Sequence, residues 1–243
     1  WAVLWKGEGS VKMKWAAHKG YKRAVLVFDV ARSKPGVSVN GKEAGKWAYG
    51  YNAFRIDITP FIQFGKSNLI EVHLNNVEES SRWYPGGGLY RPVSVELYGN
   101  ENFSTWDTFV RTLKADKQEA EVEVNALLEG KIGKSGKTVI ALLDEAGTKV
   151  AEQTIKGATP EIKTTLKVAN PQLWSPESPH LYQVKLTRYE GKKVADVQTL
   201  KTGIRTIAVS TNNGFQTNGI TGKTQVVSLH HDLGPPGAAD NKA

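Results

Sequence analysis

The sequence lacks cysteine and long apolar runs, and each absence excludes a class of structure. With no cysteine in 243 residues, disulfides and thiolate metal sites are excluded, although the absence fits a reducing or an oxidising compartment. No apolar run approaches the ~20 residues that cross a bilayer, and residues 1–5 lack the pattern of a signal peptide. We therefore expect no membrane partner.

Clusters of like charge are also missing. The net charge of +8 at pH 7 raises nucleic acid as a partner, but lysine and arginine are scattered among glutamate and aspartate. No run of five or more like charges occurs, so an ordinary solvated surface explains the charge better. We expect no nucleic-acid partner.

What the sequence does contain is alternation of apolar and polar residues, the pattern of a half-buried β-strand. It occurs at residues 37–39, 54–58, 70–74, 93–97 and 122–124, and residues 24–28 form a short apolar run with β-branched content. Further strands are predicted at 139–143, 150–155, 162–168, 182–186 and 194–200. Turn residues separate these segments, and Asn40-Gly41 is the dipeptide preferred in a two-residue hairpin turn. Apolar residues at helical spacing are not evident, which predicts an all-β chain built of sandwiches.

Composition changes twice along the chain. A predicted strand ends in the polar turn formers Gly99-Asn100-Glu101-Asn102, which indicates a domain boundary. Residues 210–243 are rich in Gly, Asn, Thr and Pro and hold too little apolar material for a core of their own. This last segment therefore looks like the start of a further domain.

Three local sequences together resemble glycoside hydrolase family 2, in particular its β-galactosidase-like members. The first is Ser81-Arg82-Trp83-Tyr84-Pro85-Gly86-Gly87-Gly88-Leu89-Tyr90-Arg91-Pro92-Val93. The second is Asn170-Pro171-Gln172-Leu173-Trp174-Ser175-Pro176-Glu177-Ser178-Pro179-His180-Leu181-Tyr182, followed by Gly203-Ile204-Arg205-Thr206. The third is Asn218-Gly219 with Leu229-His230-His231-Asp232-Leu233-Gly234. Their order and spacing favour a common origin over chance.

The resemblance implies three parts. Residues 1–100 would be a sugar-binding jelly-roll domain, altered or incomplete before Tyr21, and 101–206 an immunoglobulin-like β-sandwich. Residues 207–243 would be a linker and the first strand of a (β/α)8 barrel, a stub of the catalytic domain. Two positions depart from the family pattern: Val226-Val227-Ser228 replaces a Gly-Val-Asn type of stretch, and Asn75 replaces an acidic residue.

The resemblance also implies site residues. His230 would border the sugar pocket at the end of the first barrel strand, and Arg82, Trp83 and Tyr84 would lie on a loop that reaches the barrel mouth. An alternative role for Trp83 and Tyr84 is to seat that loop on the protein. The acid/base and nucleophile carboxylates of the family belong to the barrel, so we expect no catalytic residue in this chain.

Other residues that could carry chemistry have simpler explanations. Glu78 and Glu79 are adjacent and would point in different directions, unlike the opposed carboxylates of a retaining glycosidase, so we interpret them as a solvated loop. His230 and His231 would face opposite sides of a strand with no further ligand nearby, so no metal or cofactor is expected. Trp174, among prolines, is better explained as a structural plug.

The resemblance implies the non-catalytic portion of an exo-acting β-glycosidase that hydrolyses β-glycosidic bonds with retention. Its partner would be a β-galactoside-type carbohydrate, and assembly into a homo-oligomer stays open. Family members occur in the bacterial cytoplasm and periplasm, so the compartment is undecided. The alternative is a free-standing carbohydrate-binding β-sandwich protein, because the seven Trp and eight Tyr could stack on sugars, although core packing is their commoner use.

Overall fold

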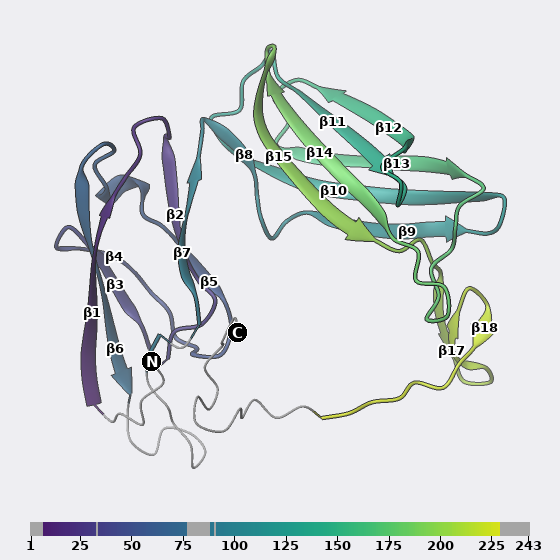
Figure 1. Ribbon diagram of the computed structural model, residues 1–243, viewed down its shortest axis with the longest axis horizontal. Helices are drawn as coiled ribbons and strands as arrows, with labels where there is room; N and C mark the ends of the chain where they lie inside the picture. The colour runs from purple at the N-terminus through teal and green to yellow at the C-terminus, as the bar shows by residue number, and fades with distance from the viewer. Residues whose placement is uncertain (1–6, 33, 77–87, 90, 229–243) are drawn as a thin grey trace. The chain divides into compact units, whose positions relative to one another are not determined.

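The computed structural model describes residues 7–32, 34–76, 88–89 and 91–228. The chain divides into two compact units between Gly99 and Asn100. Each unit has its own buried apolar cluster and its own sheets (Figure 1). Among the described residues the regular structure is β-strand apart from one short 3-10 helix, which confirms the predicted all-β fold. None of the described helices is long and apolar enough to cross a membrane.

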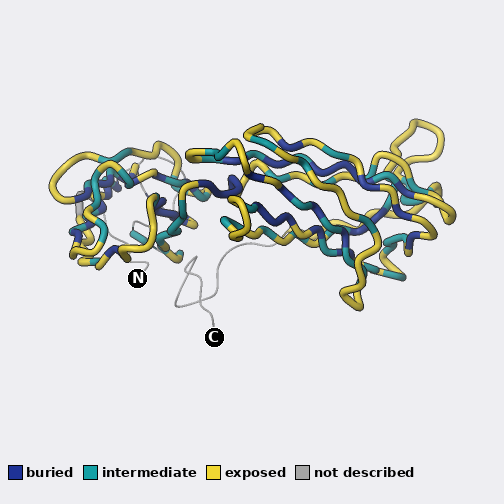
Figure 2. The backbone as a smooth tube through the Cα atoms, turned by 90° about the horizontal axis from the view of Figure 1, so that it is seen from above, coloured by how far each residue is buried: buried dark blue, intermediate teal, exposed yellow. Residues whose placement is uncertain are grey.

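The first unit is a sandwich of two antiparallel sheets. Its elements are β1 (Gly7–Ala16), β2 (Arg23–Phe28), β3 (Gly36–Val39), β4 (Lys42–Lys46), β5 (Phe54–Asp57), the 3-10 helix η1 (Thr59–Phe61), β6 (Ser67–Asn76) and β7 (Val93–Tyr98). One sheet has the order β1-β6-β3-β4 and the other β5-β2-β7. Residues that alternate along β2, β3, β5 and β6 fill the space between the sheets, and Figure 2 shows this alternation of buried and exposed positions.

The turn between β3 and β4 confirms the hairpin predicted at Asn40-Gly41. Both residues have the positive φ that a type I′ turn requires, 51° at Asn40 and 76° at Gly41. The Asn40 side chain also donates to Phe61 O and Asn68 Oδ1, and it accepts a hydrogen bond from Leu69 N. The turn therefore fixes the hairpin and ties it to the start of β6.

β1 is the one strand that precedes Tyr21 in the described part of the chain. It pairs with β6 along its whole length, from Gly7 opposite Asn76 to Ala16 opposite Ser67. Val11 and Met13 stand opposite the core residues Val72 and Ile70, so they face the core side, although at the edge of the sheet they stay 45% and 43% exposed. This strand was not among those predicted, although its residues alternate between apolar and polar.

The second unit is a larger sandwich followed by a small sheet. Its strands are β8 (Glu101–Phe103), β9 (Phe109–Ala115), β10 (Glu119–Gly130), β11 (Lys137–Leu143), β12 (Lys149–Lys156), β13 (Glu161–Ala169), β14 (Tyr182–Glu190), β15 (Lys193–Thr202), β16 (Ile207–Ser210), β17 (Gly214–Thr217) and β18 (Ile220–Thr221). Strands β13, β10 and β8, with β9 on β10, face the sheet β12-β11-β14-β15 (Figure 1). The core lies between them, with Val122 and Val124 buried as predicted.

The segment for which we expected a linker and a first barrel strand begins with the three-stranded sheet β16-β17-β18. Asn218 and Gly219, with φ of 52° and 77°, make the tight turn between β17 and β18. Residues 222–228 carry no strand, and the proposed barrel strand at 229–234 lies outside the described residues.

Candidate functional site

The four residues for which the resemblance implies sugar contact lie outside the described residues. Arg82, Trp83 and Tyr84 fall within 77–87, and His230 within 229–243. The structure describes Gly88 at the end of the Arg82 loop, and Gly88 pairs with Arg32. Gly88 N donates to Arg32 O at 2.7 Å, and Arg32 N donates to Gly88 O at 3.0 Å. The end of this loop is therefore fixed to the first sandwich.

Arg32 is also the contact point of a second segment, Tyr49-Gly50-Tyr51. The Arg32 guanidinium lies 4.3 Å from the ring centre of Tyr51, a cation–π contact. A Cβ at Gly50 would come within 2.9 Å of Arg32 Cγ, so only glycine permits this approach. Arg32 itself is 9% exposed, whereas Tyr49 and Tyr51 are 58% and 49% exposed. Arg32 thus holds an exposed aromatic segment beside the anchored end of the loop.

A column of three aromatic rings leads from the core of the first unit to its surface. Phe28 stacks on Phe54 with ring centres 4.6 Å apart, and Phe54 stacks on Trp47 at 5.3 Å. The exposed fractions rise from 0% at Phe28 to 1% at Phe54 and 36% at Trp47. Trp47 Nε1 donates to Asn52 Oδ1, and Trp47 N donates to Pro35 O. The outermost ring is therefore held in one orientation by packing and by two hydrogen bonds.

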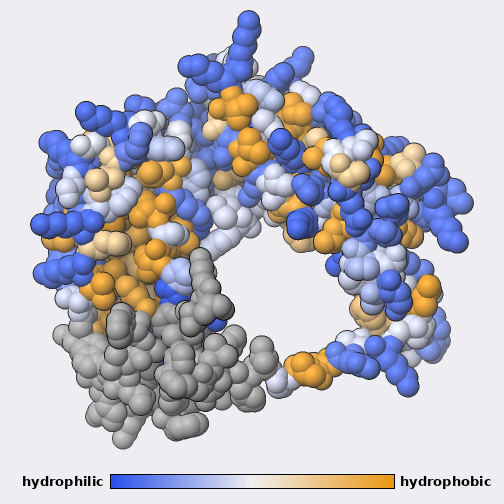
Figure 3. All heavy atoms as spheres, in the orientation of Figure 1, coloured by the Kyte–Doolittle hydropathy of each residue, from blue (hydrophilic) through white to orange (hydrophobic). Residues whose placement is uncertain are grey.

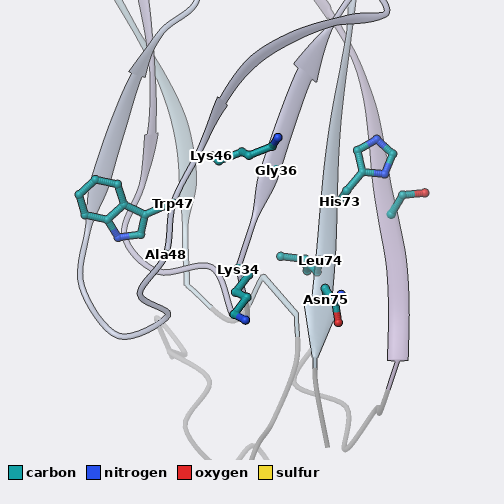
Figure 4. Close-up of a pocket in the computed structure, with 9 residues that line it drawn as sticks. Lys34, Gly36, Lys46, Trp47, Ala48, His73, Leu74 and Asn75 are labelled. Carbon is teal, nitrogen blue, oxygen red and sulfur yellow. The ribbon is translucent and has the colours of Figure 1, made fainter. Parts of the chain in front are cut away.

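Trp47 lines a pocket of about 740 Å³ in the first unit. The other described lining residues are Ser10, Lys34, Gly36, Lys46, Ala48, His73, Leu74 and Asn75. Figure 4 shows Lys34 and Lys46 between Trp47 on one side and His73 on the other. A pocket of this size matches the volume of ordinary small-molecule sites.

Strand register explains why four of the lining residues share one face of the sheet. Ser10 is opposite His73, His73 is opposite Gly36, and Gly36 is opposite Lys46, so the four form one row across β1, β6, β3 and β4. The neighbouring residues Val72 and Val37 are buried, which places the row on the face away from the core. Nothing lies within 4 Å of a Cβ built on Gly36, so the row is open at its centre.

The polar groups of the described lining include both hydrogen-bond donors and acceptors. Lys34 and Lys46 contribute ammonium groups, and Ser10, His73 and Asn75 add a hydroxyl, an imidazole and an amide. Lys46 also pairs with Glu43 at 3.1 Å, but both side chains are well exposed and the pair is weak. In the described part of the chain no group of three or more His, Cys, Asp or Glu residues is placed to hold a metal.

Glu71 lies two residues before His73 on the same face of β6. The Lys12 ammonium, 2.8 Å away, holds the pKa of Glu71 below its usual value, and His73 adds to this effect. Glu71 is therefore committed to Lys12 and does not line the pocket. The charge that the described pocket residues offer to a ligand is positive.

Sequence reasoning did not find the pocket. Trp47 comes from a segment without strand alternation, and its position over Phe54 depends on how residues 47–53 cross from β4 to β5. The one available signal was a tryptophan that closely follows the Asn40-Gly41 hairpin, flanked by Lys46. That signal does not distinguish a surface ring from a core ring.

In the second unit the sequences that carry the family resemblance meet at Trp174. Trp174 N donates to Ile204 O at 2.9 Å, and the Arg205 guanidinium lies 4.7 Å from the Trp174 ring centre. A Cβ on Gly203 would come within 2.6 Å of Trp174 Cγ, so glycine is required there. Asn218 Nδ2 donates to Trp174 O at 3.0 Å. Trp174 thus packs on the exit from the sandwich, in agreement with a structural role.

Comparison with known proteins identifies this arrangement. Residues 103–205 match the model of the glycosyl hydrolases of family 2. A crystal structure of a family 2 member from Bacteroides cellulosilyticus superimposes with a TM-score of 0.86 at 35% identity, over 96% of this chain and 33% of that one. Residues 103–205 therefore belong to the glycosyl hydrolases of family 2, and the chain as a whole is similar to members of that family.

Two relatives with different names are similar to most of this chain. A Formosa agariphila protein, named as a candidate β-glucuronidase, is 37% identical over 91% of this chain and 21% of its own length. The β-galactosidase BoGH2A of Bacteroides ovatus is 34% identical over 89% of this chain and 26% of its own length. This chain therefore spans about a fifth to a quarter of the length of these two relatives.

Proposed function

We propose that this chain is the non-catalytic sandwich portion of a β-glycosidase that hydrolyses β-glycosidic bonds with retention. One observation carries the proposal. The chain aligns with only about a fifth to a quarter of the length of relatives named as a β-galactosidase and a β-glucuronidase. Retaining hydrolysis needs two opposed carboxylates ~5–5.5 Å apart. One described pocket is lined by Asp144 and Glu145, but these are adjacent residues that accept hydrogen bonds from Thr148 N and Leu181 N, which does not favour them as an opposed pair. The chemistry would belong to the rest of a longer protein.

In this proposal the parts of the chain have separate tasks. Residues 1–100 carry the loop with Arg82, Trp83 and Tyr84, residues 101–206 form a rigid spacer, and 207–243 lead into the catalytic barrel. The Arg32–Gly88 pair supports the first task because it fixes one end of the loop. Trp174, Gly203 and Asn218 support the second, because their contacts fix the exit from the sandwich. His230 would border the sugar pocket, with a β-galactoside as the preferred substrate.

Kinetics on two proteins tests the proposal: the 243-residue chain, and the longer polypeptide encoded with it. Both are assayed on aryl β-galactosides and aryl β-glucuronides, and product stereochemistry is followed by NMR. We expect turnover with retention from the longer polypeptide only, and faster turnover of the galactoside. Trp83→Ala in the longer polypeptide is expected to lower kcat/KM at least about tenfold. Trp106→Ala, a change at an exposed tryptophan of the second unit, is the matched control.

Two results would contradict the proposal. One is enzymatic turnover by the 243-residue chain that is lost when Glu78 or Glu79 is replaced, because the carboxylates would then lie in this chain. The other is a longer polypeptide that binds glycans but hydrolyses none of the aryl glycosides. That result would favour the free-standing carbohydrate-binding protein.

A further inference from the structure

Strand β1 forms a free edge of the first sandwich. It pairs with β6 from Gly7 to Ala16, and among the described strands it has no partner on its other side (Figure 1). A strand at the edge of a sheet presents unpaired N–H and C=O groups that can pair with a further strand. The sheet β1-β6-β3-β4 can therefore be extended at β1.

Folded proteins usually protect such an edge with a bulge, a proline or a charge that hinders pairing. The pairs between β1 and β6 follow one register without a bulge, whereas the register of β3 with β4 shifts between Val37 and Ser38. The β1 segment contains no proline. Lys12 lies on the face away from the core, and its ammonium is 2.8 Å from Glu71, so its charge is already paired within the chain. The edge is therefore regular and poorly protected.

The apolar side chains of β1 face the core side of the sheet but stay exposed. Val11 and Met13 are 45% and 43% exposed, although they stand opposite the core residues Val72 and Ile70. The facing sheet β5-β2-β7 has fewer strands than the sheet that contains β1. Because β4 and β5 contact each other at one end of the sandwich, the described part of the facing sheet leaves β1, at the other end, without a cover.

β13 shows that a long, regular edge strand need not expose apolar residues. It also pairs with its neighbour β10 without a bulge, from Glu161 to Ala169. Its apolar residues Ile162, Leu166 and Val168 are nevertheless 2%, 1% and 2% exposed. β1 thus differs from β13 because it combines a regular free edge with uncovered apolar residues, and this combination favours the addition of a strand.

We propose that the free edge of β1 pairs antiparallel with β1 of a second copy of this chain, which joins the first-unit sheets of two copies into one continuous sheet. A second copy supplies a strand of the same length, with the same free backbone groups and the same uncovered apolar residues. Two-fold pairs are also the commonest closed assemblies of soluble proteins. The inference goes beyond the proposed function, since it requires neither a carbohydrate nor hydrolysis.

The side chains of β1 select one register for this pair. With Val11 of one copy opposite Val11 of the other, the uncovered apolar residues meet, and Lys12 stands opposite Ser10. A slide of the strands by two residues would instead place Lys12 opposite Lys12, and like charges directly opposite each other are unfavourable. We therefore expect the two Val11 residues to face each other at the two-fold axis.

Sedimentation velocity of the 243-residue chain over a series of concentrations tests the association. One strand pair with few apolar side chains is a small interface, so we expect a dimer with a Kd of about 1–100 μM. Val11→Lys would place two ammonium groups opposite each other, and Val11→Glu two carboxylates, so each variant should raise the Kd at least about tenfold. An equimolar mixture of the two variants should associate again, because opposite charges then face each other.

Val194→Lys is the matched control, because Val194 is a valine of the second unit with 55% exposure and lies on β15. It should leave the Kd unchanged. Melting temperatures measured well below the Kd, where every protein is monomeric, separate a loss of pairing from a loss of folding. We expect the Val11 variants to melt with the unchanged chain under these conditions, since position 11 is nearly half exposed.

A cysteine at position 11 reports the register directly. The chain contains no cysteine, so Val11→Cys introduces a single thiol. Opposite residues of an antiparallel pair have Cα atoms ~4.5–5.5 Å apart, a separation that a disulfide can span. Mild oxidation should therefore cross-link Val11→Cys into a covalent dimer faster than Val194→Cys at the same concentration.

Three results would overturn the proposal: a chain that stays monomeric up to about 1 mM, a dimer that Val11→Lys does not weaken, or a mixture of the Lys and Glu variants that stays monomeric. The first would leave the β1 edge to a strand from elsewhere in a longer polypeptide. The second would assign the association to another surface, such as the exposed Val226 and Val227. None of these outcomes depends on whether the longer polypeptide hydrolyses a glycoside.

Discussion

Arg188 and Glu101 are 87 positions apart in the sequence and form an ion pair inside the second sandwich. Arg188 Nη2 and Glu101 Oε2 are 3.1 Å apart, and each side chain is 1% exposed. The pair connects β14 in one sheet to β8 in the other. Arg188 also donates to Gly133 O and Gly157 O, and Glu101 accepts a hydrogen bond from Gly133 N. These contacts compensate much of the buried charge, although Glu101 Oε1 and Arg188 Nε are buried without a hydrogen-bond partner among the described residues.

We predict that removal of one member of this pair is strongly destabilising. Glu101→Leu would leave the Arg188 guanidinium buried without its counter-charge, and we expect the free energy of unfolding to fall by about 3–5 kcal/mol. The double variant Glu101→Leu with Arg188→Met should recover much of this loss, because no isolated charge remains buried. Urea denaturation of the three proteins measures both effects. If the double variant is as unstable as Glu101→Leu, the loss of stability does not come from an unpaired buried charge, and the ion pair itself stabilises the fold.

A second prediction concerns the contact between Gly203 and Trp174. Gly203→Ala places a methyl group within 2.6 Å of Trp174 Cγ, so the ring must move from the exit of the sandwich. We expect a loss of about 1–3 kcal/mol in the free energy of unfolding. Gly222→Ala is the matched control, because nothing lies within 4 Å of its Cβ position. If the two variants are equally stable in denaturant titration, the Trp174 packing is not rigid.

A third prediction concerns the pH dependence of stability. Hydrogen bonds from Asn125 and Arg111 lower the pKa of Glu123 below its ordinary value of 4.5. A carboxylate with a lowered pKa stabilises the fold at higher pH, and this contribution is lost as the pH falls through the pKa of the folded state. Glu123→Gln should therefore lower the melting temperature at neutral pH, and the difference from the unchanged protein should shrink below pH 4.5.

The control for Glu123 lies on the same strand. Glu121 is 4.0 Å from Lys167, whereas Glu123 is 2.8 Å from Arg111 and 3.5 Å from Lys163. Glu121→Gln should change the melting temperature less at neutral pH. A constant difference between Glu123→Gln and the unchanged protein across the acid range would mean that side-chain packing, not charge, makes Glu123 important.

Most strands that the sequence predicted have one buried face, although β7, β12 and β15 were predicted too and contain no fully buried residue. Phe54 and Ile56 in β5 and Val122 and Val124 in β10 alternate because each strand covers a core. β9 was not predicted, because its larger apolar side chains face outward: Phe109 is 59% exposed. β4 was missed because Lys42–Lys46 contains almost no apolar residue and depends on pairing with β3. Strands held mainly by backbone pairing carry no hydrophobic period to detect.

The sequence predicted the resemblance to family 2, but it did not predict the pocket in the first unit. Trp174, Gly203 and Asn218 belong to the sequences that suggested family 2, and the structure places them in contact. The pocket instead gathers Ser10, Gly36, Lys46 and His73 from four strands through register, which sequence alone does not fix. The roles of Arg82, Trp83, Tyr84 and His230 remain predictions.

The final prediction concerns the stretch after β18. Residues 222–228 carry no strand, and Val226 and Val227 are 83% and 88% exposed. Figure 3 shows apolar surface along the extended stretch that leaves the small sheet. A protease needs several residues of extended, unpaired backbone, so trypsin should cleave after Lys223 earlier than after Arg205. Arg205 is protected because its side chain stacks on Trp174 and its N–H donates to Thr112 Oγ1.

Mass spectrometry of a trypsin time course measures the order of these two cleavages. Repeating the digestion at several dilutions shows whether Val226 and Val227 associate with another molecule, because an intermolecular contact weakens on dilution and cleavage then accelerates. Slow cleavage after Lys223 at every dilution would mean that this stretch packs firmly within one molecule. That outcome would contradict a segment that needs the rest of a barrel to complete its hydrogen bonds, and with it the assigned task of residues 207–243.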